Sequence, residues 1–148
     1  MALFKRILHP SDFSSASAPA FKQAVELARA NHARLLIVHV LPPVAMVPDA
    51  YLATRIHEGL LRGHRAQGQR QLDRLVTKAR QARVRASSLL LDFGVAHERI
   101  VRIAKSQRSH LIVMGTHGRT GFAKIALGSV AERVVTMAPC PVVTVRAR

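Results

Sequence analysis

The run Arg34–Leu41 constrains the fold more than any other stretch of the chain. After Arg34 it is apolar at every position except His39. A strand that is apolar on both sides must be buried on both faces, which is typical of parallel sheets covered by helices. A second buried strand, Leu111–Met114, stops at Gly115. We see no linker or repeat, so the length of 148 residues predicts one α/β domain over residues 1–148.

Strand and helix patterns alternate along the whole chain. We expect strands at 3–9, 34–41, 84–91, 111–114 and 141–145, and helices after 11–15, over 51–83, around 100–104 and over 130–137. This alternation predicts an open parallel sheet with helices on both faces, joined by right-handed crossovers. In such sheets ligands bind beyond the carboxyl ends of the strands, where the strand order reverses.

The segment 51–83 reads as one long helix or two. Its ends are periodic, but the middle, Arg62–Arg70, is polar all round and contains Gly63 and Gly68. We expect this middle part to be exposed, and its two glycines leave a kinked helix open as an alternative to a straight one. The two glycines have the spacing of a P-loop, but no Lys-Ser/Thr follows them and no strand precedes them, so a P-loop is excluded.

The composition is strongly basic, with 23 Lys and Arg against 8 Asp and Glu and a net charge of +15. Such a charge favours polyanions but does not determine the fold. Nine of the basic residues lie between Arg55 and Arg85 and could contact a phosphate backbone. No aromatic residue lies among the basic positions of that helix, so a solvated helix face is the favoured interpretation and nucleic acid is not expected.

Cellular location and redox state follow from what the sequence lacks. The single cysteine, Cys140, excludes an internal disulfide and a cysteine metal site. No apolar run approaches the roughly 18 residues that span a bilayer, and no signal peptide is recognised. We therefore expect a cytoplasmic protein without a membrane partner.

A glycine-rich loop follows the strand 111–114. It contains Gly115, Gly118 and Gly128, after which Ser129 and Glu132 have the spacing of a capping box. A helix that starts after such a loop attracts phosphate through its unpaired N–H groups and its dipole. Turn formation alone is the alternative role of the glycines. Ser129 as N-cap would compete with a ligand for the same hydroxyl oxygen.

Four polar residues near the expected strand ends could each have more than one role. Asp12 either caps the turn after the first strand or contacts a ligand. His117 could act as a general base, but no partner side chain is patterned around it. His9 and His39 end neighbouring strands, and core or cleft positions are favoured over a zinc site. The first turn has no glycine, which excludes the dinucleotide fingerprint.

Together these motifs resemble the universal stress protein family, of the ATP-binding type. Gly115-x-x-Gly118, nine residues and Gly128-Ser129 match its signature loop, and Pro10-Ser11-Asp12 matches its Pro-x-Asp turn. The resemblance implies a Rossmann-like, adenine nucleotide alpha hydrolase-like fold with five parallel strands in the order 3-2-1-4-5. It also implies a homodimer, for which the apolar edge strand Val142–Val145 is the expected contact.

The resemblance further implies an ATP site. It puts Asp12 near the ribose, the Val40 backbone against the adenine, and the loop glycines and Ser129 around the phosphates. The complete predicted set is Pro10, Ser11, Asp12, Val40, Met114, Gly115, His117, Gly118, Gly128, Ser129 and Val130. Ala131 stands where family members often carry a hydroxyl residue, so one phosphate hydrogen bond is expected to be missing.

We therefore expect an ATP-binding regulatory module of the stress response, with Mg²⁺ held mainly by the phosphates. A slow ATP hydrolase is one alternative, and a polyanion-binding protein that uses the helix between Arg55 and Arg85 is another. An efficient enzyme is not expected, because the chain lacks the base, arginine and metal apparatus of the usual nucleotide hydrolases.

Overall fold

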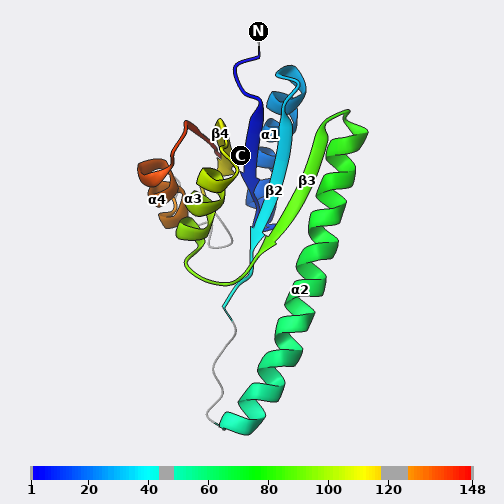
Figure 1. Ribbon diagram of the computed structural model, residues 1–148, viewed down its shortest axis with the longest axis vertical. Coiled ribbons are helices and arrows are strands. Elements are labelled where there is room, and N and C mark those ends of the chain that lie inside the picture. Colours follow the sequence, from blue (N-terminus) through cyan, green and yellow to red (C-terminus); the bar gives the residue numbers. More distant parts are fainter. Residues whose placement is uncertain (1, 44–48, 118–126, 148) are drawn as a thin grey trace.

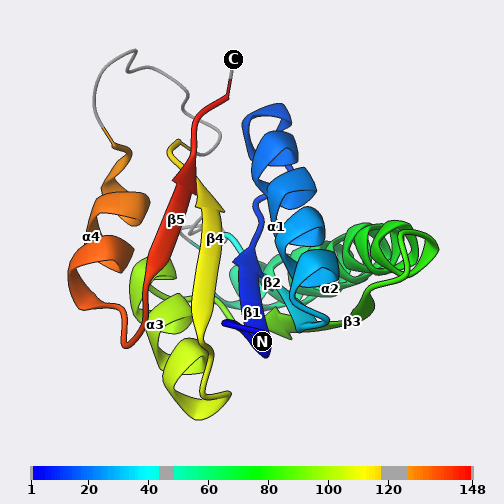
Figure 2. The ribbon, with the colours of Figure 1, turned by 90° about the horizontal axis from the view of Figure 1, so that it is seen from above.

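The fold is a five-stranded parallel sheet with helices on both faces (Figures 1 and 2). It is seen in a computed structural model that describes residues 2–43, 49–117 and 127–147. The strands are β1 (Arg6–Pro10), β2 (Arg34–Val40), β3 (Arg85–Leu91), β4 (Leu111–Gly115) and β5 (Val142–Val145). Their order is β3-β2-β1-β4-β5, which confirms the predicted topology. The first strand begins at Arg6 rather than Leu3 and includes Pro10.

The helices lie in two layers. A short 3-10 turn, η1 (Ser15–Ser17), precedes α1 (Ala18–Ala30), and α1 and α2 (Ala50–Gln81) cover one face of the sheet. The other face carries α3 (Ala96–Ser106) and α4 (Ser129–Met137) (Figure 2). None of the helices, over the residues described, is long and apolar enough to cross a membrane.

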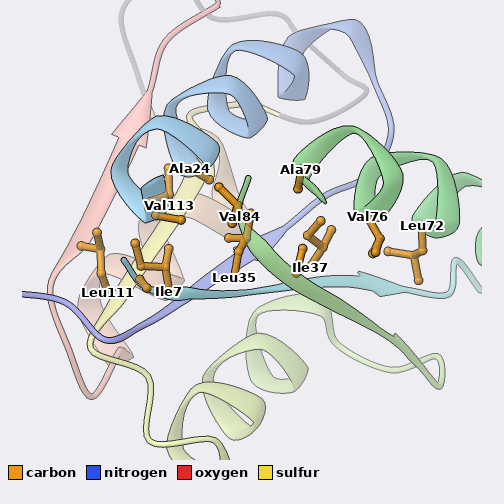
Figure 3. Close-up of a cluster of buried hydrophobic side chains, with 13 residues drawn as sticks. Ile7, Ala24, Leu35, Ile37, Leu72, Val76, Ala79, Val84, Leu111 and Val113 are labelled. Atoms are coloured by element: carbon orange, nitrogen blue, oxygen red, sulfur yellow. The ribbon is translucent and has the colours of Figure 1, made fainter. Parts of the chain in front are cut away.

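Two hydrophobic cores result from the alternation of side chains along the strands. Ile7, Leu35 and Ile37 point toward α1 and α2, where they meet the buried faces of those helices (Figure 3). Leu8 and Val38 point the opposite way and join the buried residues of α3 and α4. Strands that are apolar on both sides are thus explained by a sheet covered on both faces.

Helix α2 is continuous, and its first half projects beyond the sheet (Figure 1). The expectation that its middle is fully exposed is wrong at Gly68, which is buried. A Cβ at Gly68 would lie 3.0 Å from Leu90 Cδ1 and 3.4 Å from His39 Cδ2. The helix approaches the sheet closely there because glycine has no side chain, whereas Gly63 faces open space.

The pairing of β1 with β4 ends early, because Pro10 lacks a backbone donor. The last register pair is Leu8 with Ile112. Ser11 N donates to Val38 O at 2.8 Å, so the backbone N–H and C=O groups of odd-numbered residues in this segment point toward β2. The backbone groups of even-numbered residues, including Pro10, point toward β4. Proline has no N–H to offer there. The Nδ1–H of His9 donates instead to Val113 O at 2.8 Å.

A second buried histidine has the same role between β1 and β2. The Nδ1–H of His39 donates to Ser11 O at 2.8 Å, just beyond the last register pair, Pro10 with Val38. Each ring lies against an aromatic side chain, His9 on Phe21 and His39 on Phe13. Neither histidine belongs to a group of three or more potential metal ligands, as far as the described residues show.

Burial makes protonation of His9 unfavourable. The side chain is 0% exposed, and desolvation lowers its pKa from 6.5 to about 4, although the Val113 carbonyl and Asp12 act in the opposite direction. The unfolded chain therefore binds a proton between these two pH values while the folded chain does not. Stability is fully retained above about pH 6.5 and falls as the pH drops toward about 4.

We expect His9→Asn to flatten this part of the stability profile. The asparagine amide can still donate to Val113 O but cannot titrate in this range. The free energy of unfolding of the wild type should fall by about 3 kcal/mol more than that of the variant between pH 6.5 and pH 4. Urea unfolding at a series of pH values measures both slopes. Parallel slopes would show that His9 does not carry the pH dependence.

Candidate functional site

A pocket of about 550 Å³ opens at the carboxyl ends of the strands, where the strand order reverses between β1 and β4. Its wall combines the turn after β1, the end of β2, the start of α3, the end of β4 and the start of α4. The lining residues are Pro10, Ser11, Asp12, Ser17, Val38, His39, Val40, Pro42, Pro43, Ala96, Ile100, Met114, Gly115, Thr116, His117, Gly128, Ser129, Val130 and Ala131. The volume is in the range of small-molecule sites.

Every predicted site residue that the structure describes lines this one pocket. Gly118 lies outside the described residues. Sequence reasoning missed the wall that α3 supplies through Ala96 and Ile100, and it missed Pro42 and Pro43. The helical spacing of Ala96 and Ile100 was a usable signal for a shared face, but nothing in the sequence said that the face reaches the pocket.

The start of α4 differs from the predicted capping box. Gly128, with φ −62° and ψ 157°, is the N-cap, and no side chain caps the helix. Gly128 O accepts the first helical bond from Glu132 N at 2.9 Å. Ser129 is therefore the first helical residue, one position too late to cap. The competition between capping and ligand binding for its hydroxyl does not arise.

Gly128 and Gly115 differ in whether the surrounding structure requires glycine at their positions. A Cβ on Gly128 would lie 2.8 Å from Thr116 O, the carbonyl that accepts from Gly128 N at 2.7 Å. Close approach of two backbone segments thus excludes a side chain at Gly128. A Cβ on Gly115 would have no neighbour nearer than 3.4 Å, an ordinary contact. Close backbone packing therefore accounts for Gly128, whereas packing does not require glycine at Gly115.

The turn after β1 is held by its own hydrogen bonds. Asp12 Oδ1 accepts from Ser14 N at 2.9 Å, and Ser11 Oγ accepts from Phe13 N at 3.1 Å. Ser14 Oγ accepts from Ser17 N at 3.2 Å, which caps η1. Phe13 adopts a left-handed conformation with φ 63°. The turn is preformed, so Asp12 both stabilises it and lines the pocket.

The polar character of the pocket comes mainly from backbone groups and small side chains. Among the described lining residues the ionisable side chains are Asp12, His39 and His117, with no Lys or Arg. His117 Nδ1 lies 3.1 Å from Thr116 Oγ1, and its Nε2 is buried without a hydrogen-bond partner in the described structure. An unpaired buried nitrogen is costly unless a ligand or water satisfies it.

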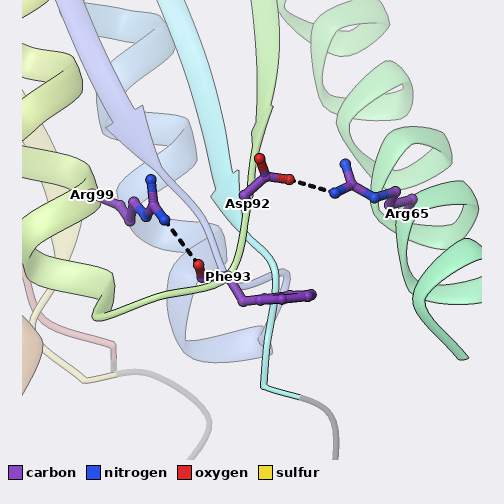
Figure 4. A network of polar contacts seen from close by, with 4 residues as sticks. All are labelled: Arg65, Asp92, Phe93 and Arg99. Carbon is purple, nitrogen blue, oxygen red and sulfur yellow. Dashed lines mark hydrogen bonds and ion pairs between the residues drawn. The ribbon is translucent and has the colours of Figure 1, made fainter. Parts of the chain in front are cut away.

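A polar network fixes the α3 wall of the pocket (Figure 4). Arg99 of α3 donates to Phe93 O at 3.1 Å, and Arg65 of α2 forms an ion pair with Asp92. Both partners of that ion pair are exposed, by 44% and 63%, so it is worth at most about 1 kcal/mol. Its effect is to locate the turn from which α3 begins.

The fold and the pocket define a Rossmann-like α/β protein with a crevice at the strand-order reversal. The model of the universal stress protein family matches residues 3–146. The chain belongs to the universal stress protein family.

Individual relatives agree with this assignment. A universal stress protein of Thermus aquaticus is 37% identical, and the match covers 97% of this chain and 100% of the relative. One from Methanocaldococcus jannaschii is 36% identical over 97% of this chain and 83% of its own length. The solved UspA of Lactobacillus plantarum superposes with a TM-score of 0.85 at 26% identity, over 99% of this chain and 100% of that chain.

The two glycines of the site should respond differently to substitution. Gly128→Ala should destabilise the fold by more than about 1 kcal/mol, because its Cβ overlaps Thr116 O and neither backbone can move freely. Gly115→Ala should stay within about 0.5 kcal/mol of the wild type. Thermal and urea unfolding of both variants provide the comparison. Equal stability of the two variants would contradict the backbone contact at Gly128.

Proposed function

We propose that the chain is a regulatory module that binds ATP in the pocket between β1 and β4. The observation that carries this proposal is that the turn after β1, the end of β2 and the start of α4 line one pocket. These are the segments that the resemblance assigns to ribose, base and phosphates. A role in the stress response and a cytoplasmic location are part of the same proposal.

The start of α4 supports phosphate binding. Its first N–H groups have no capping side chain, so their hydrogen-bonding capacity remains for a ligand. The helix dipole favours an anion at the same place. The Ser129 hydroxyl adds a donor that no cap uses. The pocket therefore offers fixed backbone dipoles to a phosphate, without side-chain cations among its described lining residues.

The end of β2 supports recognition of an adenine base. Val38 O points toward β1, and backbone groups two residues apart on a strand point the same way. The N–H and C=O of Val40 therefore also point toward the β1 side, beyond the last register pair, Pro10 with Val38. A donor and an acceptor on one residue complement the edge of adenine, which presents an amino group beside an acceptor nitrogen. Val38, Ile100 and Ala96 supply apolar contacts for the ring.

Structures with the same fold have been solved with related ligands. They are complexes of universal stress proteins with cAMP, with dAMP and, for an Arabidopsis thaliana protein, with AMP, at 21%, 21% and 20% identity to this chain. At this identity the likeness shows the fold alone, so the proposal rests on the chain's own pocket. Mg²⁺ would be held mainly by the phosphates, since Asp12 is the one carboxylate among the described lining residues.

The proposal is tested by titrating ATP and adenosine into the wild type and into Ser129→Ala. Loss of one hydrogen bond to a charged phosphate should weaken ATP binding about tenfold or more. Adenosine affinity should not change, because adenosine has no phosphate to contact Ser129. Ser87→Ala, at an exposed position of β3, is the control. Calorimetry gives the affinities, and analysis of the same samples for ADP tests the hydrolase alternative.

Each result has a defined meaning. If Ser129→Ala leaves the ATP affinity unchanged, the proposal that the phosphates bind at the start of α4 is wrong. Absence of ATP binding in the wild type would overturn the proposed function. Steady formation of ADP above about 1 s⁻¹ would assign the protein to the hydrolases instead.

We also propose a homodimer through β5. Val142–Val145 pairs with β4 on one side only, and all four residues are partly exposed. The neighbouring helix α4 exposes Val135 and Met137 by 46% and 45%. Antiparallel pairing of β5 with its copy about a two-fold axis would satisfy both edges and cover these apolar side chains.

The backbone pattern identifies the residue that tests this pairing. Pro141 O and Val145 O accept from β4, so Val142 and Thr144 direct their N–H groups to the open edge. Thr144→Pro removes an outward donor, which an edge strand tolerates, and should convert the dimer to a folded monomer. Thr144→Val keeps the donor and should stay dimeric. Sedimentation measures the oligomeric state of each variant. A monomeric wild type at micromolar concentration would contradict the proposed dimer.

A further inference from the structure

One part of the sheet has no helix over it. On the face that carries α3 and α4, the β3 residues Arg85, Ser87 and Leu89 are all exposed. Figures 1 and 2 show that α3 and α4 cover the part of this face toward β4 and β5, and that no helix lies over β3 on this face. A sheet of this class normally has both faces covered. The uncovered area, defined by Arg34, Arg85, Ser87 and Leu89, is called the open face below.

A row of three arginines runs across the strands at this end of the sheet. Arg6 is in register with Arg34, and Arg34 is in register with Arg85. Residues in register on neighbouring strands project to the same face, about 4.8 Å apart. Like charges directly opposite one another destabilise a sheet. The row therefore costs stability unless other groups neutralise it.

No carboxylate neutralises the row within the described part of the chain. Arg6 donates to Arg108 O at 2.7 Å and lies beside His110 Nε2. Arg85 donates to His32 O at 2.9 Å. These partners orient the guanidinium groups but carry no negative charge. The backbone N–H of Arg34 donates to Lys5 O at 3.0 Å, but its side chain has no hydrogen bond or ion pair among the described residues.

Protection of the sheet edge does not explain the row. Charged residues on an edge strand prevent pairing with other chains, and Arg85 on β3 could serve in this way. Arg34 lies on β2, which has β1 and β3 on its two sides, so it protects no edge. The apolar Leu89, 39% exposed on the same face of β3, works against such protection.

We propose that the open face binds an acidic amphipathic helix of a partner protein. Such a helix would lie beside α3 and complete the helix layer, with its apolar side on Leu89 and the partly buried Leu36. Its acidic side would meet Arg34 and Arg85. A second copy of this chain is disfavoured as the occupant of the open face, because it would have to bring acidic groups to Arg34 and Arg85 and the chain has 8 Asp and Glu against 23 Lys and Arg. A nucleic acid would find no aromatic side chain on this face to stack on.

The test uses a labelled helical peptide of about 18 residues, roughly five turns, with leucines along one side and glutamates flanking them. Fluorescence anisotropy should detect binding to the full-length protein. Arg34→Glu/Arg85→Glu should weaken it at least about tenfold. Arg70→Glu/Arg74→Glu makes the same change in net charge on exposed positions of α2 and should change binding less than about twofold.

A third variant separates an amphipathic helix from a simple polyanion. Leu89→Gln should weaken peptide binding about threefold or more while leaving all charges in place. Melting temperatures confirm that the variants fold, as their exposed positions lead us to expect. Equal losses in both charge-reversal variants would overturn the proposal, as would failure of the peptide to bind. Binding of duplex DNA in preference to the peptide, insensitive to Leu89→Gln, would do the same.

Discussion

The missing N–H of Pro10 is the constraint on which the pocket depends. A longer ladder would close β1 against β4, but Pro10 has no donor for Val113 O and the register ends at Leu8. The His9 ring supplies that donor from the side, and His39 does the same for Ser11 O. The strand ends therefore separate without leaving these buried carbonyls unsatisfied. His9 thus acts at the strand-order reversal between β1 and β4, and His39 acts between β1 and β2 beside the same pocket.

The start of α4 is positioned by backbone contact rather than by a cap. The bond from Gly128 N to Thr116 O ties the loop's end to the end of β4, and it requires the absence of a Cβ. Thr116 N in turn donates to Val145 O at 3.0 Å, which connects the same point to β5. The uncapped helix start therefore faces the crevice from a fixed position, as an anion site of oriented dipoles requires.

The sequence predicted a parallel sheet covered on both faces because hydrophobic periodicity and alternation report burial directly, as Leu35–Val38 illustrates, whereas the strand order came from the family resemblance. The meeting of Asp12 with the start of the glycine loop follows from parallel strands, which bring their carboxyl ends to one edge, whereas the remaining site residues came from the family resemblance. Side-chain direction was harder. Ser129 was misassigned as N-cap because one residue of offset decides which hydroxyl caps. Gly68 was misjudged because a glycine suits either an exposed or a closely packed helix face. The role of His9 depends on a tertiary contact 104 positions away.

The direction of the helices explains part of the strong positive charge. In a parallel α/β fold the helices end at the amino edge of the sheet, and α1, α2 and α3 all carry basic residues in their last turns. Those cations are stabilised by the negative ends of the helix dipoles. The same geometry turns the positive end of α4 toward the pocket. Arg6, Arg34 and Arg85 differ because they lie in register on three neighbouring strands, where Arg6 and Arg85 donate to carbonyls just beyond the ends of α3 and α1. No carboxylate among the described residues neutralises the row, which is why this row, and not the basic helix α2, points to a partner.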